Sequence, residues 1–411
     1  MISASLRRQP PTPEVSFSVQ SAHSRSGADG PRVAIAHDYL TQLGGAEKTV
    51  LNMAKAFPGA PIYTMLYEPE ATFPEFQELD VRVPAFNKVK PFRKYHRAAL
   101  PVLPLVARSI FIDADVVLCS SSGWAHGFQT NGRKLVYCHS PARWLYQAES
   151  YLGDTGNALA RLGLRATSPY LRSWDRNAAA SSDRYLANST EIQRRVLDAY
   201  GIEADVVFPP VSMPRADQTE PIAEVTDWLG RWSLDDSYYL VVSRLLPYKN
   251  VDAIVRAFAG ADRRLVIVGQ GPQADRLREL KTDNVVMLAN LTDGALAWLY
   301  EHCKAIIAAS YEDYGLTPLE AGVWGKPAIA LRFGGFLDTI REGVSGIHFD
   351  EPWPGAISEA LDRFESMSFD GDAVRNHVHQ FGLQVFSEKL RNAVDGLASL
   401  GPKADREGKL T

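Results

Sequence analysis

Two carboxylates, Glu312 and Glu320, flank a stretch of the chain that could bind an anion. This stretch follows an apolar segment and opens a predicted helix, so the backbone amides of Gly315, Leu316 and Thr317 would point outward from the helix N-terminus. A helix N-terminus favours negative charge and suits a diphosphate. The flanking carboxylates could hold the hydroxyl groups of a sugar and of a ribose. The stretch is therefore a candidate site for a diphosphate, with two carboxylates beside it.

Only one of the two carboxylates, Glu320, could also have a purely structural role. Thr317 is a good N-cap residue, Pro318 suits the first helical position, and Glu320 would complete a capping box. Glu320 could therefore be explained by helix capping alone. Glu312 has no such explanation, because it lies in the loop at the carboxyl end of a predicted strand, where ligands bind in parallel sheets.

The first half of the chain predicts a strand, a glycine turn and a helix, and then further strands. The apolar segment 32–36 leads into Gly44-Gly45, and apolar residues recur after it at helical spacing. Further strands are predicted at 115–119, 134–138, 184–187 and 206–208. Apolar strands without alternation indicate a parallel sheet covered on both faces. A double glycine lets a ligand approach the backbone closely, although it could equally form only a tight turn.

The second half repeats the same arrangement. Strands are predicted at 239–242, 265–268, 285–288, 305–308 and 328–331, with a helix over 251–258. We therefore predict an α/β protein with two Rossmann-like domains that face a central cleft. The first spans residues 31–210, the second spans 236–372, and a closing helical segment at 373–400 packs back on the first. Residues 1–30 are rich in Ser, Arg and Pro and are predicted to be disordered.

Composition excludes several other classes of protein. The formal net charge of −4 gives no sign of nucleic-acid binding. Cys119, Cys138 and Cys303 are widely spaced in apolar surroundings and are predicted to be buried thiols of a reducing compartment. We expect a cytoplasmic protein, since no apolar run is long enough to span a bilayer.

One basic segment could place the protein against the inner face of the cell membrane. Residues 88–97 contain five lysines and arginines with aromatic residues between them, which could contact an anionic membrane or a lipid diphosphate acceptor. A solvated basic helix is the alternative. Asp113-Ala114-Asp115 has the form of a metal-binding motif, but it precedes a strand, at the wrong end for a ligand. No metal is predicted.

The stretch E-D-Y-G-L-T-P-L-E-A resembles the signature of glycosyltransferase family 4, whose members retain anomeric configuration and have the GT-B fold. Segment 242–250 resembles the Arg…Lys segment of the family, and 267–272, which contains Gly269, resembles the glycine turn of its second domain. After Gly334-Gly335 the family usually has a glutamate, whereas this chain has Asp338, so the contact made there could differ.

The resemblance implies a role for each matching residue. Arg244 and Lys249 would neutralise the diphosphate of the sugar donor and stabilise the departing nucleoside diphosphate. Glu312 would contact the transferred sugar and Glu320 the ribose. His139 would lie near the sugar, where its ring or its backbone carbonyl could stabilise developing positive charge.

The run from His37 to Glu47, together with Y-C-H-S-P-A-R-W-L-Y, most resembles mannosyltransferases of bacterial surface-polysaccharide assembly. The resemblance implies GDP-mannose as the donor, a glycan or lipid-linked acceptor, front-face attack, and no cofactor. A UDP-sugar such as UDP-glucose is an alternative donor. Rossmann-like halves also permit a nucleotide-sugar epimerase, a dinucleotide oxidoreductase or a non-catalytic binding subunit. The bare Gly44-Gly45 turn argues against the oxidoreductase.

Overall fold

The structure is a computed structural model of the chain. It describes residues 30–89, 91, 93, 102–147, 158–211, 219–231, 237–401 and 403. The predicted disordered segment 1–30 therefore lies almost wholly outside the described residues. So does most of the basic segment 88–97. No helix in these described ranges has the length and apolar content needed to cross a bilayer.

The first half of the chain forms a seven-stranded parallel sheet in the order β3-β2-β1-β5-β7-β8-β9. Its central strand β5 is buried along its whole length, as expected for a strand covered on both faces. The strands are β1 Val33–His37, β2 Ile62–Thr64, β3 Val81–Arg82, β5 Val116–Ser121, β7 Arg133–Cys138, β8 Arg184–Ala187 and β9 Asp205–Val206. Two short strands of the same half, β4 Phe111–Ile112 and β6 Gln129–Thr130, pair in parallel as a separate ladder.

Helices connect the strands of this sheet. Helix α7 shows why the sequence specifies them, because Ser189 accepts a hydrogen bond from the Ile192 amide as the N-cap and Gly201 ends the helix in a left-handed conformation. The other helices are α1 Gly45–Ala56, α3 Leu103–Ser109, α4 Arg143–Tyr146 and α6 Ala158–Ala180, and α7 itself spans Thr190–Tyr200.

The second half forms a six-stranded parallel sheet in the order β12-β11-β10-β13-β14-β15. Its strands are β10 Tyr239–Val242, β11 Leu265–Val268, β12 Val285–Leu288, β13 Ala305–Ala308, β14 Ala328–Leu331 and β15 Gly346–Phe349. Its helices are α8 Ala223–Leu229, α9 Val251–Phe258, α10 Ala274–Leu280, α11 Asp293–His302, α12 Thr317–Val323, α13 Phe336–Thr339 and α14 Pro354–Glu365. The predicted fold class, two doubly wound α/β units, is confirmed.

Helix α8 belongs to the core of the second sheet, although it precedes residue 236, where we predicted that domain to begin. Val225, Trp228 and Leu229 are buried in the same apolar cluster as the strands of that sheet. The Trp228 indole also donates to the Asp283 carbonyl at 2.9 Å. The second unit therefore extends earlier in the chain than the prediction.

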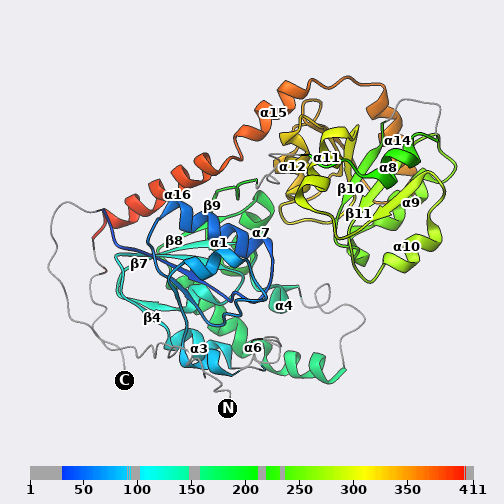
Figure 1. Cartoon of the computed structure of the whole chain (residues 1–411). Helices are drawn as coiled ribbons and strands as arrows, with labels where there is room; N and C mark the ends of the chain where they lie inside the picture. The colour runs from blue at the N-terminus through cyan, green and yellow to red at the C-terminus, as the bar shows by residue number, and fades with distance from the viewer. Residues whose placement is uncertain are drawn as a thin grey trace, which may run out of the picture. The chain divides into compact units, whose positions relative to one another are not determined.

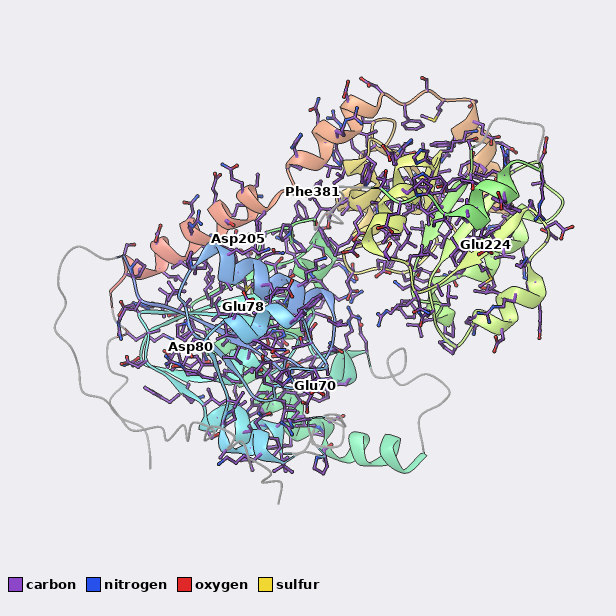
Figure 2. All side chains as sticks on the ribbon, in the orientation of Figure 1. Glu70, Glu78, Asp80, Asp205, Glu224 and Phe381 are labelled. Carbon is purple, nitrogen blue, oxygen red and sulfur yellow. The ribbon has the colours of Figure 1, made fainter. Side chains whose placement is uncertain are left out.

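The C-terminal segment, predicted to be helical over 373–400, consists of two helices. Helix α15 spans Gly371–His379 and packs on α12, whereas α16 spans Leu383–Ala398 and packs on α1, β5 and β7 (Figure 1). Phe381, labelled in Figure 2, is buried at the break. Gly382 has an extended backbone as the N-cap of α16, which interrupts the helical hydrogen bonding.

Candidate active site

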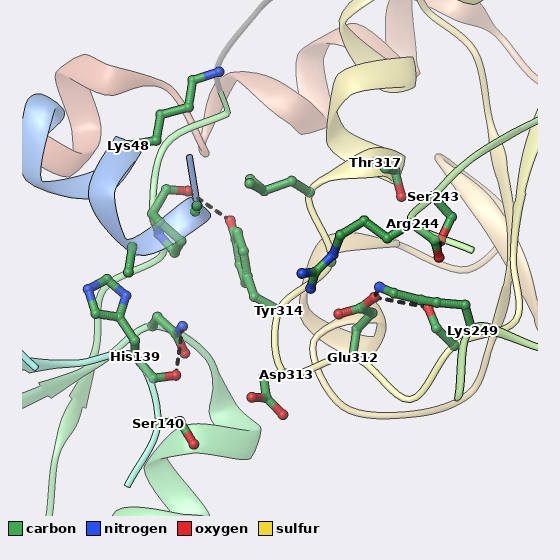
Figure 3. Close-up of a pocket in the computed structure, with 18 of the residues that line it drawn as sticks. Lys48, His139, Ser140, Ser243, Arg244, Lys249, Glu312, Asp313, Tyr314 and Thr317 are labelled. Carbon is green, nitrogen blue, oxygen red and sulfur yellow. Dashed lines mark hydrogen bonds and ion pairs between the residues drawn. The ribbon is translucent and has the colours of Figure 1, made fainter. Parts of the chain in front are cut away.

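Polar residues gather where strands of the two sheets end. In the first sheet, Gly44 and Gly45 follow β1 and His139 follows β7. In the second sheet, Arg244 and Lys249 follow β10 and Glu312 follows β13. All six residues line one pocket (Figure 3). The amide-bearing residues Gly315, Leu316 and Thr317 line it as well. The structure thus brings together most of the residues singled out in the sequence, at the strand ends where ligands bind in such sheets.

Lys249 and Glu312 form an ion pair in this pocket. The Lys249 Nζ donates to Oε1 of Glu312, and the Ser310 hydroxyl donates to the same oxygen at 3.1 Å. The side chains are 12% and 24% exposed. Asn250, in a left-handed conformation, donates from its amide to the Ala309 carbonyl at 2.8 Å, which fixes the Lys249 turn to the end of β13. Two loops far apart in sequence therefore hold this pair.

The electrostatics of the pocket favour an anion. Burial, and then the neighbouring guanidinium groups of Arg244 and Arg143, lower the pKa of Lys249 to about 8. Arg244 is exposed, and its guanidinium donates to the Tyr248 hydroxyl over a long distance of 3.5 Å. Mutually repelling cations of this kind are stabilised by a diphosphate placed between them, and its binding would raise the pKa of Lys249.

The turn that leads into α12 requires glycine at position 315. Gly315 has φ +80°, and a Cβ there would lie 2.4 Å from the Phe336 ring. Within the described parts of the chain, the amides of Gly315, Leu316 and Thr317 donate no hydrogen bond to another residue. They remain available to an anion at the N-terminus of α12.

The capping box predicted at Thr317 is wrong. Leu316 is the N-cap of α12 and has helical backbone angles, so Thr317 lies already inside the helix and makes no side-chain cap. Glu320 instead accepts a hydrogen bond of 2.7 Å from the Tyr300 hydroxyl on α11, and burial raises its pKa. Glu320 does not line the pocket of Figure 3. Its contact with a ribose stays a prediction.

Gly269 also lies outside the set of residues that line the pocket. A Cβ at this position would lie 1.8 Å from the Ser243 carbonyl oxygen, so the close approach of two backbones explains the glycine without any ligand. Gly45 differs, because a Cβ there would meet no atom within 4 Å. Gly45 lines the pocket, and a side chain there would have open space.

These two glycines give a matched pair of predictions. We expect Gly45→Ala to leave the melting temperature unchanged and to raise KM for the nucleotide sugar about tenfold, because the methyl group would occupy space that the ligand needs. We expect Gly269→Ala to lower the free energy of unfolding by about 3 kcal/mol through its clash with Ser243. Urea unfolding and initial-rate kinetics test both. Equal losses of unfolding free energy in the two variants would contradict the different roles given to Gly45, at the ligand, and Gly269, in backbone packing.

His139 follows β7 and is tied to the first sheet. Its Nε2 lies 2.7 Å from the Ser120 hydroxyl, and its backbone carbonyl accepts from the Asn188 amide at 3.2 Å. Burial, and then the positive charge of His37, lower the pKa of His139 to about 3. The ring is therefore neutral at physiological pH.

Several pocket residues were not predicted as site residues. Asp313, beside Glu312, forms ion pairs with Arg143 and Arg195, the latter at 2.7 Å. Tyr314 donates from its hydroxyl to the Pro209 carbonyl at 3.0 Å. Arg143 lies in the same run as His139, and Asp313 and Tyr314 lie in the same run as Glu312, so proximity in sequence was the available signal.

Two other acidic positions have structural partners. Asp338 accepts hydrogen bonds of 2.8 Å from both the amide and the hydroxyl of Thr190, at the N-terminus of α7. Asp113 and Asp115 bind Arg32. No cluster of His, Cys, Asp or Glu suited to a metal occurs among the residues that the structure describes. The three cysteines are buried free thiols.

Two family models match consecutive parts of the chain. The model described as Glycosyltransferase Family 4 matches residues 43–213, and the model described as Glycosyl transferases group 1 matches residues 229–381. Together they cover most of the chain, which belongs to the family 4 glycosyltransferases of GT-B fold. The protein is an enzyme of this class, and the epimerase, oxidoreductase and non-catalytic alternatives are set aside.

Individual relatives resemble the chain to different extents. The alpha-1,3/1,6-mannosyltransferase ALG2 of Homo sapiens is 25% identical, over 92% of this chain and 99% of the relative. ALG2 of Dictyostelium discoideum is 24% identical, over 76% and 85%. A D-inositol 3-phosphate glycosyltransferase of Acidothermus cellulolyticus is 30% identical, but the match spans only 49% of this chain and 50% of that protein.

Solved structures share the fold at low sequence identity. The lipopolysaccharide outer core galactosyltransferase WaaB, in its apo form, aligns with a TM-score of 0.60 at 16% identity, over 89% of this chain and 99% of that one. Anabaena HepE, in complex with UDP and glucose, aligns with a TM-score of 0.61 at 15% identity, over 90% and 100%. At this identity the likeness establishes the fold.

Proposed function

We propose that the enzyme transfers mannose from GDP-mannose, with retention of anomeric configuration, to a glycan or lipid-linked acceptor. The observation that carries the proposal is the pocket in which Lys249, Arg244 and Glu312 meet the free amides of Gly315 to Thr317. Mannose is favoured because the ALG2 mannosyltransferases resemble the chain over most of its length.

In the proposed reaction the cations act on the leaving group. Negative charge grows on the nucleoside diphosphate as the glycosidic bond breaks, and Lys249, Arg244 and the α12 amides would stabilise that charge. Glu312 would accept a hydrogen bond from a hydroxyl of the transferred sugar. An acceptor hydroxyl would attack from the face that the diphosphate leaves, and its proton would pass to an oxygen of the departing diphosphate. This scheme requires no metal or cofactor.

A UDP-sugar is the second candidate donor. HepE, which shares the fold, was solved with UDP and glucose. The diphosphate is common to both donors, so the enzyme would have to distinguish them by contacts with the base, guanine or uracil.

The experiment that tests the proposal measures nucleotide preference directly. Purified enzyme is incubated without acceptor with GDP-mannose, UDP-glucose and UDP-galactose, and the slow release of each nucleoside diphosphate is recorded. We expect GDP release to exceed UDP release, and GDP to raise the melting temperature more than UDP or NAD does. Release of UDP alone would replace GDP-mannose by a UDP-sugar, and protection by NAD alone would overturn the proposed donor site.

A further inference from the structure

A chain of buried polar groups extends behind His139 inside the first sheet. The His139 Nε2 lies 2.7 Å from the Ser120 Oγ, and that oxygen lies 3.0 Å from the His37 Nδ1. The His37 Nε2 lies 3.9 Å from the Glu47 carboxylate. Ser120, His37 and Glu47 are at most 2% exposed. Since β1, β5, β7 and α1 supply these residues, one rigid unit fixes their geometry.

The hydrogen on the His37 Nδ1 can be located from its neighbours. This nitrogen lies 3.1 Å from the Ser120 backbone carbonyl, and a carbonyl oxygen can only accept. The His37 Nδ1 must therefore carry a hydrogen and donate it. Because the same N–H also faces the Ser120 Oγ, that oxygen accepts from His37 on this side.

The direction of the next hydrogen bond follows. A serine hydroxyl can accept two hydrogen bonds and donate one, so Ser120 still has its own hydrogen to donate while it accepts from His37. The His139 Nε2, at 2.7 Å, is placed to receive that hydrogen. In this arrangement the His139 Nε2 is the acceptor. A neutral imidazole has one N–H, so in His139 the hydrogen lies on Nδ1.

Charge at the far end stabilises this arrangement. Glu47 accepts from the Gln42 amide at 2.9 Å, while its other oxygen is buried with no hydrogen-bond partner in the described part of the chain. A buried carboxylate of this kind needs a nearby positive charge. Burial alone lowers the pKa of His37, but Glu47 and Asp38 outweigh it, and the pKa is raised.

We propose that Ser120, oriented by the His37–Glu47 pair, fixes His139 as the neutral tautomer with its hydrogen on Nδ1. In this tautomer the ring offers the bound nucleotide sugar a hydrogen-bond donor, and its one basic nitrogen is occupied by Ser120. His139 is then no proton acceptor in the transfer. Ser120, His37 and Glu47 are positioning residues, and this account of the sugar contact rests on the proposed function.

The tautomer is measured in the ligand-free enzyme by nitrogen-15 NMR of labelled histidines, with His139→Gln used to assign the resonances. We expect a pyridine-like Nε2 and a pyrrole-like Nδ1 in His139. Histidine in water favours the opposite tautomer, so Ser120→Ala should reverse the pattern, whereas Ser109→Ala, an exposed serine of the same domain, should not. A hydrogen on Nε2 in the wild-type enzyme would overturn the proposal even if Ser120→Ala did not fold.

Kinetics provide a second readout. Ser120→Ala should lower kcat about tenfold and leave the affinity for the nucleoside diphosphate within about twofold, because the changed group faces the sugar. An unchanged kcat with a reversed tautomer would overturn the functional half of the proposal. The NMR result does not depend on which nucleotide sugar is used, so it separates this inference from the choice of donor.

Discussion

Replacement of Lys249 by alanine is expected to lower kcat/KM for sugar transfer by about a thousandfold. Both loops hold Lys249 in the pocket, and the negative charge on the leaving diphosphate grows as the transition state is approached. Its removal also leaves Glu312 as a negative charge where the diphosphate would bind. Initial rates with saturating acceptor, together with nucleoside diphosphate binding by calorimetry, measure both effects.

The fold of this variant is expected to persist. Glu312 is 24% exposed and keeps its hydrogen bond from Ser310, so loss of the ion pair should cost about 1.5–3 kcal/mol of unfolding free energy. Lys55→Ala is a matched control, because Lys55 is an exposed lysine of α1 outside the pocket. Activity near the wild-type level in Lys249→Ala would refute the role given to this cation.

Glu312→Gln is expected to lower kcat about a hundredfold while nucleoside diphosphate affinity is kept or increased. The amide oxygen can still accept from Lys249 and Ser310, so the loops should stay in place. The lost negative charge removes the strongest acceptor for a sugar hydroxyl, and it frees Lys249 for the phosphates. Rapid-quench measurement of a single turnover separates the chemical step from product release.

The matched control is Glu224→Gln, which makes the same substitution at an exposed glutamate of α8 (Figure 2). It should keep wild-type kinetics. A variant at Glu312 that lost nucleotide affinity but kept kcat would place this carboxylate at the nucleotide and not at the sugar.

The sequence predicted the buried strands of the second sheet well. The predicted strands at 239–242, 265–268, 285–288, 305–308 and 328–331 coincide with the observed bounds. Continuous apolar runs between turn residues identify such strands because both faces are covered. The strands β2, β3 and β15 were not predicted, although only β3 and β15 lie at a sheet edge. They are short, and pairing with a neighbour in space, not their own composition, makes them strands.

The candidate site was predicted in outline for a similar reason. His139, Arg244 and Glu312 each follow a strand whose end could be located, so parallel topology alone brings them to one region. Ser120 and Glu47 gave no such signal. Their positioning role depends on contacts between residues of β1, β5 and α1, which are far apart in the sequence. No local sequence pattern predicts such contacts.

The error at Glu320 has a physical cause. Thr, Pro and Glu at these spacings satisfy the chemistry of a capping box. The helical backbone of Leu316 moves the start of the helix by one residue, and the Tyr300 hydroxyl on α11 offers Glu320 a better partner. A tertiary contact thus overrides a local preference.

The packing of helix α16 on the first sheet determines when the first domain can complete its core during synthesis. Phe386, Leu390 and Val394 share one apolar cluster with strands β1, β5 and β7, and the Phe386 ring meets Tyr137 edge to face at 5.8 Å. The first half of the chain leaves the ribosome early, yet its core lacks these side chains until α16 has been synthesised. Through this interval the nascent first domain exposes an apolar face, which is a natural binding surface for a chaperone.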